Sequence, residues 1–170
     1  MNLKIGICDD DAAQVDLTES LTSQWARENG HNIKIKTYNS AESFLFDFEE
    51  ENDFDILLLD IEMGETDGVA LAKQVRKKSE TVQIVFITGY SDYISEGYDV
   101  AVLHYLMKPL KAEKLFEVLN HAAVKIKKDE KTVILKTEDE IFRIPIREIK
   151  YIDVCKNDIT IHAKSDITVR

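Results

Sequence analysis

The sequence predicts an α/β fold: a doubly wound parallel sheet of five βα units, followed by a partial antiparallel β domain. Three observations support this prediction. Short β-rich runs alternate with amphipathic segments as far as about residue 127. After a charged stretch, the pattern changes to short runs of alternating apolar residues separated by turn-like sequences. The 170 residues, 44% hydrophobic and 32% charged, suffice for one full domain and part of another.

The five strands are predicted from β-rich runs at residues 3–8, 33–38, 56–59, 83–87 and 102–106. After most of these runs, apolar residues recur three or four positions apart, which indicates an amphipathic helix. The first helix is predicted over residues 12–29, with one face formed by Leu17, Leu21 and Trp25. The helix over residues 111–127 has the clearest period, in Leu115, Leu119, Ala122 and Ile126. Five such units favour a parallel sheet with helices on both faces.

Capping residues and charges mark the remaining helices. Ser40 can cap the second helix, and Asp67 with Gly68 opens the third. The last turn of the third helix is basic, which suits the negative end of the helix dipole; its residues are Arg76, Lys77 and Lys78. A short, weaker fourth helix is predicted over residues 92–99.

The chain is predicted to consist of a domain at residues 1–127, a charged linker at 128–131 and a β region at 132–170. The β region is inferred from the runs TVILKT, EIFRI, IKYIDVC, DITIHA and DITV. Turn-like TEDE and KND separate some of these runs, as in antiparallel hairpins. The sequence stops at Arg170, inside the last predicted strand.

The formal net charge of −10 is concentrated in the first part of the chain. Residues 131–170 contain eight Lys or Arg and seven Asp or Glu, which gives +1 there and leaves −11 on residues 1–130. The first part is therefore expected to bind cations or basic partners rather than nucleic acid.

Several classes of protein are disfavoured. No apolar run reaches the roughly 18–20 residues of a membrane helix, and MNLKIGICDDD does not resemble a signal peptide. Cys8 and Cys155 lack CxxC spacing, which favours buried thiols in a cytoplasmic protein over a disulfide. The four histidines show no metal-ligand spacing, which argues against zinc.

The stretch DILLLDIEMGETDG, residues 55–68, places an acid directly after an apolar run. The run at 56–59 reads as a strand buried on both faces. Because burying an ionised carboxylate costs several kcal/mol or more without compensation, Asp60 is expected at the exposed end of this strand. Function gathers at the carboxyl ends of parallel strands, so one site is expected to unite Asp9, Asp10, Asp11, Asp60, Thr88 and Lys108.

The chemistry of this site follows from its residue types. Converging carboxylates share protons or hold a metal, and ligands that are all oxygen favour Mg²⁺ or Mn²⁺. In proteins, Mg²⁺ is commonly bound by one or two carboxylates together with phosphate oxygens. The acids are therefore interpreted as one half of a phosphate site, and Lys108 with the Thr88 hydroxyl as the other half. No GxxxxGK[ST] loop is present, which argues against a P-loop nucleotide site. Asp60 is the best placed nucleophile and would form an acyl phosphate. Asp11 is interpreted as a solvated turn residue.

These residues resemble the receiver domains of two-component response regulators. The matching motifs are CDDD at 8–11, LLLDIEM followed by DG at 67–68, ITG at 87–89 and YLMKP at 105–109. The resemblance covers residues 1 to about 127 and implies a flavodoxin-like fold. It further implies that Asp60 accepts a phosphoryl group from a sensor histidine kinase, in a signalling protein with at most slow self-dephosphorylation.

The resemblance also assigns a role to each acid. Asp10 and Asp60 would ligate Mg²⁺ directly, Asp9 would act through water, and Glu62 would offer its backbone carbonyl. Gly64 departs from the family, because many members have Pro after the residue corresponding to Met63.

Other motif residues would respond to the phosphoryl group. Lys108 would pair with it, and Pro109 would follow a cis peptide bond. Thr88 and Tyr105 fit the switch pair of a hydroxyl and an aromatic ring. His104, which precedes Tyr105, is interpreted as a surface or packing residue.

The tail is similar to the start of a LytTR-type DNA-binding domain, through its strand rhythm and IREIKYIDVCKNDITIHA at 146–163. Such a domain needs roughly 100 residues, so only its N-terminal part would be present here. Lys156 and Asn157 are candidate DNA contacts, although a simple β-turn explains them equally well. The preferred hypothesis is a transcription regulator that forms a homodimer on phosphorylation, with no membrane partner.

Two alternatives remain. A receiver that acts only through protein contacts would explain residues 1–127 and leave the tail without a role. An aspartate-based phosphohydrolase of the haloacid dehalogenase type also uses a strand-end Asp and Mg²⁺. However, residues 60–64 fit its motif only loosely, and no cap domain is evident.

Overall fold

The computed structural model describes residues 1–64, 66–89, 100–129, 132–136, 141–146, 149–155, 158–162 and 167–169. The chain forms two compact units, Met1–Ile126 and Lys127–Arg170. The predicted helix at residues 92–99 and the candidate DNA contacts Lys156 and Asn157 lie outside the described residues.

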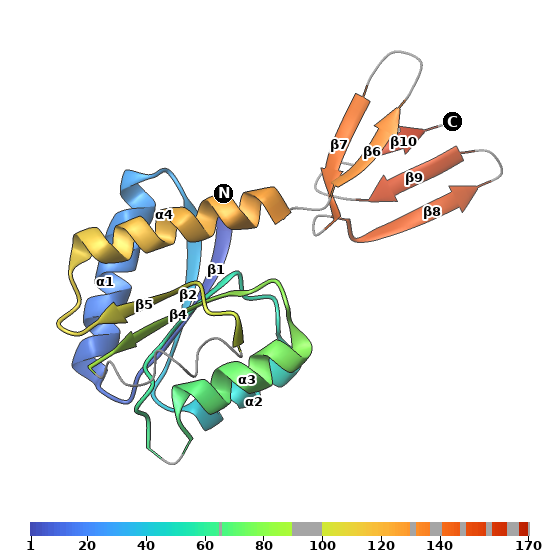
Figure 1. Ribbon diagram of the computed structural model, residues 1–170. Helices are drawn as coiled ribbons and strands as arrows, with labels where there is room; N and C mark the ends of the chain where they lie inside the picture. The colour runs from blue at the N-terminus through green and yellow to red at the C-terminus, as the bar shows by residue number, and fades with distance from the viewer. Residues whose placement is uncertain are drawn as a thin grey trace. The chain divides into compact units, whose positions relative to one another are not determined.

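The first unit is built on a five-stranded parallel sheet with the order β2-β1-β3-β4-β5 (Figure 1). The strands are β1 (Asn2–Cys8), β2 (Asn32–Tyr38), β3 (Ile56–Leu59), β4 (Gln83–Thr88) and β5 (His104–Met107). This order is that of flavodoxin-like folds, with β1 and β3 in the interior of the sheet. The predicted fold class is therefore confirmed.

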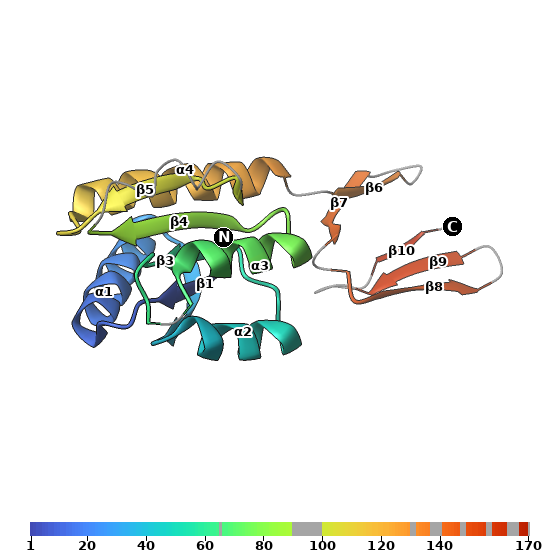
Figure 2. The ribbon, with the colours of Figure 1, turned by 60° about the horizontal axis from the view of Figure 1, so that its bottom comes forward.

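Helices cover both faces of this sheet, as Figures 1 and 2 show from two directions. On one face, α1 (Ala12–Glu28) and α4 (Ala112–Asp129) pack through a core that includes Trp25 and Leu119. On the other face, α2 (Ala41–Glu50) and α3 (Gly68–Lys78) pack through a core that includes Phe44 and Leu71. The helix labelled α4 corresponds to the one predicted over residues 111–127.

Strand β3 shows why a continuous apolar run was needed. Ile56 and Leu58 point into the core beneath α1 and α4, whereas Leu57 and Leu59 point into the core beneath α2 and α3. All four are at most 1% exposed. Side chains alternate between the faces of a strand, so a strand covered on both sides must be apolar at every position.

Two predicted boundaries differ from the structure. Helix α4 continues to Asp129, so the predicted linker at 128–131 begins inside the helix. Lysine is a good helix former and suits the C-terminal end of the dipole, which favours this extension. Strand β5 begins at His104 rather than at residue 102, because its ladder with β4 starts at the pair Val85 and His104.

Arg76 has a different role from the dipole contact that its position predicted. Its guanidinium group is half-buried and donates hydrogen bonds to four backbone carbonyls, those of Ser79, Val82, Val100 and Ala101. These bonds join the end of α3 to the approaches to β4 and β5.

The second unit contains antiparallel β structure, as predicted. Strands β6 (Thr132–Lys136) and β7 (Ile141–Pro145) form one pair. Strands β8 (Tyr151–Cys155), β9 (Asp158–His162) and β10 (Ile167–Val169) form a sheet in the order β10-β9-β8. The small core of this second unit is centred on Ile144 of β7 and Ile161 of β9.

Candidate functional site

The predicted acids and lysine converge at the carboxyl edge of the parallel sheet, where backbone hydrogen bonds fix their positions. The backbone amide of Asp60 donates a hydrogen bond to the carbonyl oxygen of Cys8 at 2.8 Å. The backbone amide of Lys108 donates one to the carbonyl oxygen of Thr88, also at 2.8 Å. Both bonds extend the pairing of neighbouring strands by one step. The sheet itself therefore brings residues 9, 60 and 108 together.

Lys108 joins two buried carboxylates. Its Nζ lies 2.8 Å from Oδ2 of Asp9 and 2.8 Å from Oδ2 of Asp60. The other oxygen of each acid accepts a backbone N–H, from Asp11 at 3.0 Å and from Ile61 at 2.7 Å respectively. These contacts compensate for the burial of both acids, which are only 5% and 7% exposed. Asp60 is thus more buried than its predicted place at an exposed strand end implied.

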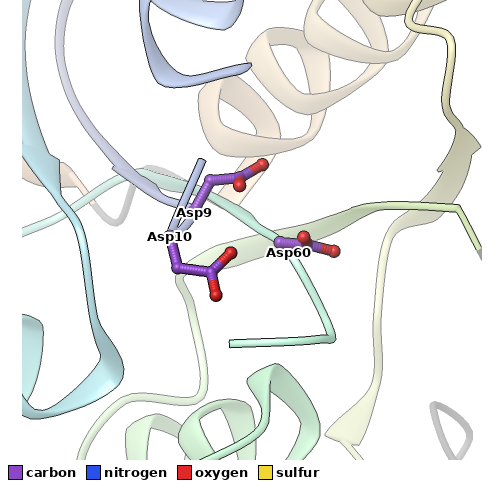
Figure 3. A group of neighbouring side chains, drawn as sticks. All are labelled: Asp9, Asp10 and Asp60. Atoms are coloured by element: carbon purple, nitrogen blue, oxygen red, sulfur yellow. The ribbon is translucent and has the colours of Figure 1, made fainter. Parts of the chain in front are cut away.

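Asp10 adds a third, exposed carboxylate to this pair. One oxygen from each of Asp9, Asp10 and Asp60 lies within 4.8 Å of the others. Figure 3 shows the first two on the segment that follows β1 and the third on the segment that follows β3. A cleft of about 620 Å³ opens beside them, and Glu62 and Lys108 also line it. The cluster is therefore accessible from solution.

Electrostatics hold the lysine in its charged form. Burial raises the pKa of the Asp9 carboxyl, and hydrogen bonds from Lys108 and the Asp11 amide only partly oppose this effect. Burial would lower the pKa of Lys108, but hydrogen bonds to Asp60 and Asp9 outweigh it and the pKa is raised. The ammonium group therefore stays positive and faces the centre of the acidic cluster.

The loop after β3 is shaped by two glycines. A Cβ on Gly68 would lie 1.9 Å from the carbonyl oxygen of Asp60, so only glycine fits where α3 meets this strand end. Gly64 has a φ of +56°, a conformation that the fixed ring of proline cannot adopt. Glycine in place of the proline of many family members therefore gives residue 64 a backbone conformation that proline could not adopt.

The predicted switch residues share one face of the sheet. Thr88 ends β4 and is fully buried, two residues beyond Phe86. Tyr105 pairs with Phe86 in the ladder, and the two rings lie 5.2 Å apart between centroids. Phe86 therefore lies across the ladder from Tyr105 and two residues before Thr88, on the same face of the sheet.

Other predicted residues have simpler places. Asp11 is exposed, and its side chain accepts the amide of Ala13 at 2.9 Å, so it caps α1 and lies outside the carboxylate cluster. His104 is exposed, as expected. The peptide bond between Lys108 and Pro109 is cis, which confirms what the resemblance implied.

Sequence reasoning used Gly68 only as a helix start and missed its contact with Asp60. The DG pair at 67–68 marked the glycine as notable, but the sequence does not show that Gly68 approaches the carbonyl oxygen of Asp60. The hydrogen bond from the Thr66 hydroxyl to Glu42 was also missed; it lowers the pKa of that carboxyl and links the loop after β3 to the start of α2.

The five-stranded parallel sheet, with two acids and a lysine in contact at its carboxyl edge, places the chain among the flavodoxin-like α/β domains. The family model described as "Response regulator receiver domain" matches residues 5–120. The chain therefore belongs to the response regulator receiver family. Among the described residues, no helix combines the length and apolar character needed to cross a membrane.

Curated relatives and solved structures agree with this assignment. The transcriptional regulatory protein NatR of Bacillus subtilis is 31% identical over 113 residues, which cover 66% of this chain and 46% of NatR. The sensory transduction protein LytT of Bacillus anthracis is 25% identical over 126 residues, covering 65% of this chain and 51% of LytT. The response regulatory domain of mrkE from Klebsiella pneumoniae has a TM-score of 0.67 at 21% identity, covering 75% of this chain and all of that domain. The chain thus spans about half the length of these two curated relatives.

Proposed function

We propose that the protein is a response regulator whose Asp60 accepts a phosphoryl group from a sensor histidine kinase. One observation carries this proposal: Asp60 is held at the end of a buried strand, 2.8 Å from the Lys108 ammonium and within 4.8 Å of two further carboxylates. A carboxylate in this setting is fixed in position, opens onto a cleft and has a cation beside it.

The chain's own residues can carry out the transfer. A carboxylate oxygen of Asp60 attacks phosphorus, and the new O–P bond forms as the P–N bond to the kinase imidazole breaks. The imidazole leaves with the electron pair of that bond. Lys108, which already faces Asp60, stabilises the negative charge on the phosphoryl oxygens. Slow hydrolysis of the acyl phosphate would return Asp60 to its free state.

The acidic cluster fits Mg²⁺. The three clustered ligands are carboxylates on two adjacent loops, and hard cations prefer oxygen. Asp10 and Asp60 would bind directly, Asp9 through water, and Glu62 through its backbone carbonyl. When bound, the cation would neutralise charge on the phosphoryl oxygens. Thr88 and Tyr105 would act as the switch pair that responds to the phosphoryl group, on the sheet face that they share with Phe86.

For the output, we propose that residues 132–170 form the N-terminal part of a LytTR-type DNA-binding domain. The antiparallel strands of this unit and the similarity of the chain to LytT and to transcriptional regulatory proteins support this assignment. Phosphorylation would promote a homodimer that places two such domains on paired sites. The alternative is a receiver that acts only through protein contacts.

The phosphoacceptor role is tested by incubation with acetyl phosphate and Mg²⁺, followed by intact-protein mass spectrometry. One phosphoryl adduct is expected on the wild type and none on Asp60→Asn. The control is Asp11→Asn, which changes an exposed acid of the same loop that lies outside the cluster and should leave the adduct intact. Equal phosphorylation of Asp60→Asn would refute the assignment.

A further inference from the structure

The middle of α2 presents an aromatic side chain to solvent. Phe44 and Phe48 are at most 1% exposed, because they point into the core against the sheet. Phe46, between them, points away from the core and is 72% exposed. A single exposed apolar residue is ordinary on a protein surface, so Phe46 becomes informative only through its surroundings.

Phe46 forms one wall of a groove of about 660 Å³ between the N-terminal half of α1, the end of β2 and α2. The half-buried Val15 of α1 lines the groove, and the buried Tyr38 at the end of β2 contributes to its lining. The exposed aromatic ring therefore borders a hollow with further apolar surface. A hollow of this kind can receive an apolar side chain from another molecule.

Two carboxylates border the same groove. Asp47 is fixed, because its Oδ2 accepts the Tyr38 hydroxyl at 3.1 Å and lies 3.5 Å from Nζ of Lys36. Asp16 is exposed on α1. Residues 1–130 carry a net charge of −11, so the field around the groove favours cationic groups. An arginine there could pair with a carboxylate and also stack on the ring of Phe46.

The groove adjoins the acidic cluster through the backbone. The amide of Asp9 donates to the carbonyl of Tyr38 at 3.1 Å, which connects a cluster acid to a residue that lines the groove. Ala12, another lining residue, immediately follows the α1 cap Asp11. A molecule bound in the groove would therefore lie beside the loop that carries Asp9 and Asp10.

We propose that this groove, defined here by Val15, Asp16, Tyr38, Phe46 and Asp47, docks a partner protein through one apolar side chain flanked by Arg or Lys. The apolar side chain packs against Phe46 and Val15. Its basic neighbours pair with Asp16 and Asp47. The surface is independent of phosphoryl transfer, because its lining contains none of the residues assigned to that chemistry.

The probes are two synthetic helical peptides that share a central Leu, flanked by arginines in one and by glutamates in the other. Binding is followed by amide chemical shifts of the isotope-labelled 170-residue protein. The arginine peptide should shift residues 12–16, 37–39 and 43–47 in a saturable way, and the glutamate peptide should not. Phe46→Ser and Asp16→Asn should each weaken binding by about tenfold, as expected for contacts that dominate an interface.

Two matched variants separate the groove from general attraction. Leu17→Ser removes an exposed apolar side chain of α1 that does not line the groove, and Glu19→Gln removes an exposed acid of the same helix. Both should bind the arginine peptide like the wild type. The proposal is overturned if shifts gather around Asp10 and Asp60 instead, if neither peptide saturates, or if Phe46→Ser binds with unchanged affinity.

Discussion

At the scale of single residues, the close approach of Gly68 constrains the position of Asp60, the proposed phosphoacceptor. We predict that Gly68→Ala lowers the free energy of unfolding by about 1–3 kcal/mol, the usual cost of overpacking. The added Cβ would lie 1.9 Å from the Asp60 carbonyl oxygen, so the backbone must move. The measurement is the urea midpoint of unfolding.

Gly89→Ala is the matched control for this substitution. Gly89 follows β4 at the same edge of the sheet, but a Cβ there would meet nothing within 4 Å. Its midpoint should stay close to that of the wild type. Equal midpoints for the two variants would show that the contact between Gly68 and Asp60 does not constrain the fold.

Asp10 provides a test of the proposed metal site that does not depend on phosphorylation. Mg²⁺ should raise the thermal midpoint of the wild type, because binding to the native state alone stabilises it and relieves carboxylate repulsion. Asp10→Asn should lose most of this response and be more stable than wild type without metal. Asp11→Asn should respond like wild type, because Asn also caps helices and residue 11 lies outside the cluster. An undiminished response of Asp10→Asn would place the cation elsewhere.

At the scale of elements, the sequence predicted what depends on local pattern and on strand order. The run at 56–59 was recognisable as a strand because both of its faces are covered, and α4 because its apolar residues recur with the helical period. The meeting of Asp9, Asp60 and Lys108 followed from the rule that function gathers where parallel strands end.

What sequence reasoning missed depends on which distant segments meet. From the sequence, Arg76 was one of three basic residues expected to interact with the dipole of α3. In the structure it donates hydrogen bonds to the carbonyls of residues 100 and 101, which lie about 25 positions further along the chain. Gly68 likewise looked like a helix start, and its close approach to Asp60 exists only in the folded chain. Periodicity contains no information about either contact.

The end of α2 offers a prediction about pH. The pKa of Glu51 is lowered from 4.5 to about 2, because its carboxylate accepts hydrogen bonds from Lys36 and Lys4. Because this pKa is lower in the folded state than in the unfolded state, the ionised carboxylate stabilises the fold at pH values above the unfolded-state pKa of about 4.5. This contribution is lost as the pH falls from about 4.5 toward 2. Between pH 6 and pH 3, wild type should therefore lose more stability than Glu51→Gln.

Urea midpoints at the two pH values measure this difference. Glu50→Gln serves as the control, because it removes the neighbouring exposed acid and should follow the wild-type pH dependence. If Glu51→Gln loses as much stability on acidification as the wild type, the ion pairs with Lys4 and Lys36 do not contribute to the fold in solution.

At the scale of the whole molecule, the two units differ in core and in charge. Among the described residues, Ile144 and Ile161 are the buried hydrophobic residues of the second unit, whereas seven of its large apolar side chains are exposed. They are Ile134, Ile141, Ile146, Tyr151, Ile152, Val154 and Ile159. The first unit has an extensive core on each sheet face, so it should hold its fold independently, and the second should contribute little to overall stability.

The same division leads to a prediction about DNA. Residues 1–130 carry −11 and residues 131–170 only +1, whereas DNA affinity grows with the number of phosphates that Lys and Arg neutralise. The 170-residue chain should therefore bind duplex DNA weakly or not at all, with or without the phosphoryl mimic beryllofluoride. Beryllofluoride should instead promote self-association, visible by sedimentation.

In the test, one labelled promoter fragment is titrated at fixed salt with the wild type and with Asp60→Asn, each with and without beryllofluoride. DNA binding and the sedimentation of each protein are measured. If Asp60 is the phosphoacceptor, only the wild type should change its sedimentation, because the mimic would bind to the carboxylate of Asp60. Neither protein should bind the fragment tightly. If the reading frame continues past Arg170, its longer product should gain DNA binding that steepens with beryllofluoride, because dimerisation would place two β domains on paired half-sites. Tight, sequence-specific binding by the 170-residue chain would contradict the charge argument. A longer product that still failed to bind would favour a receiver that acts only through protein contacts.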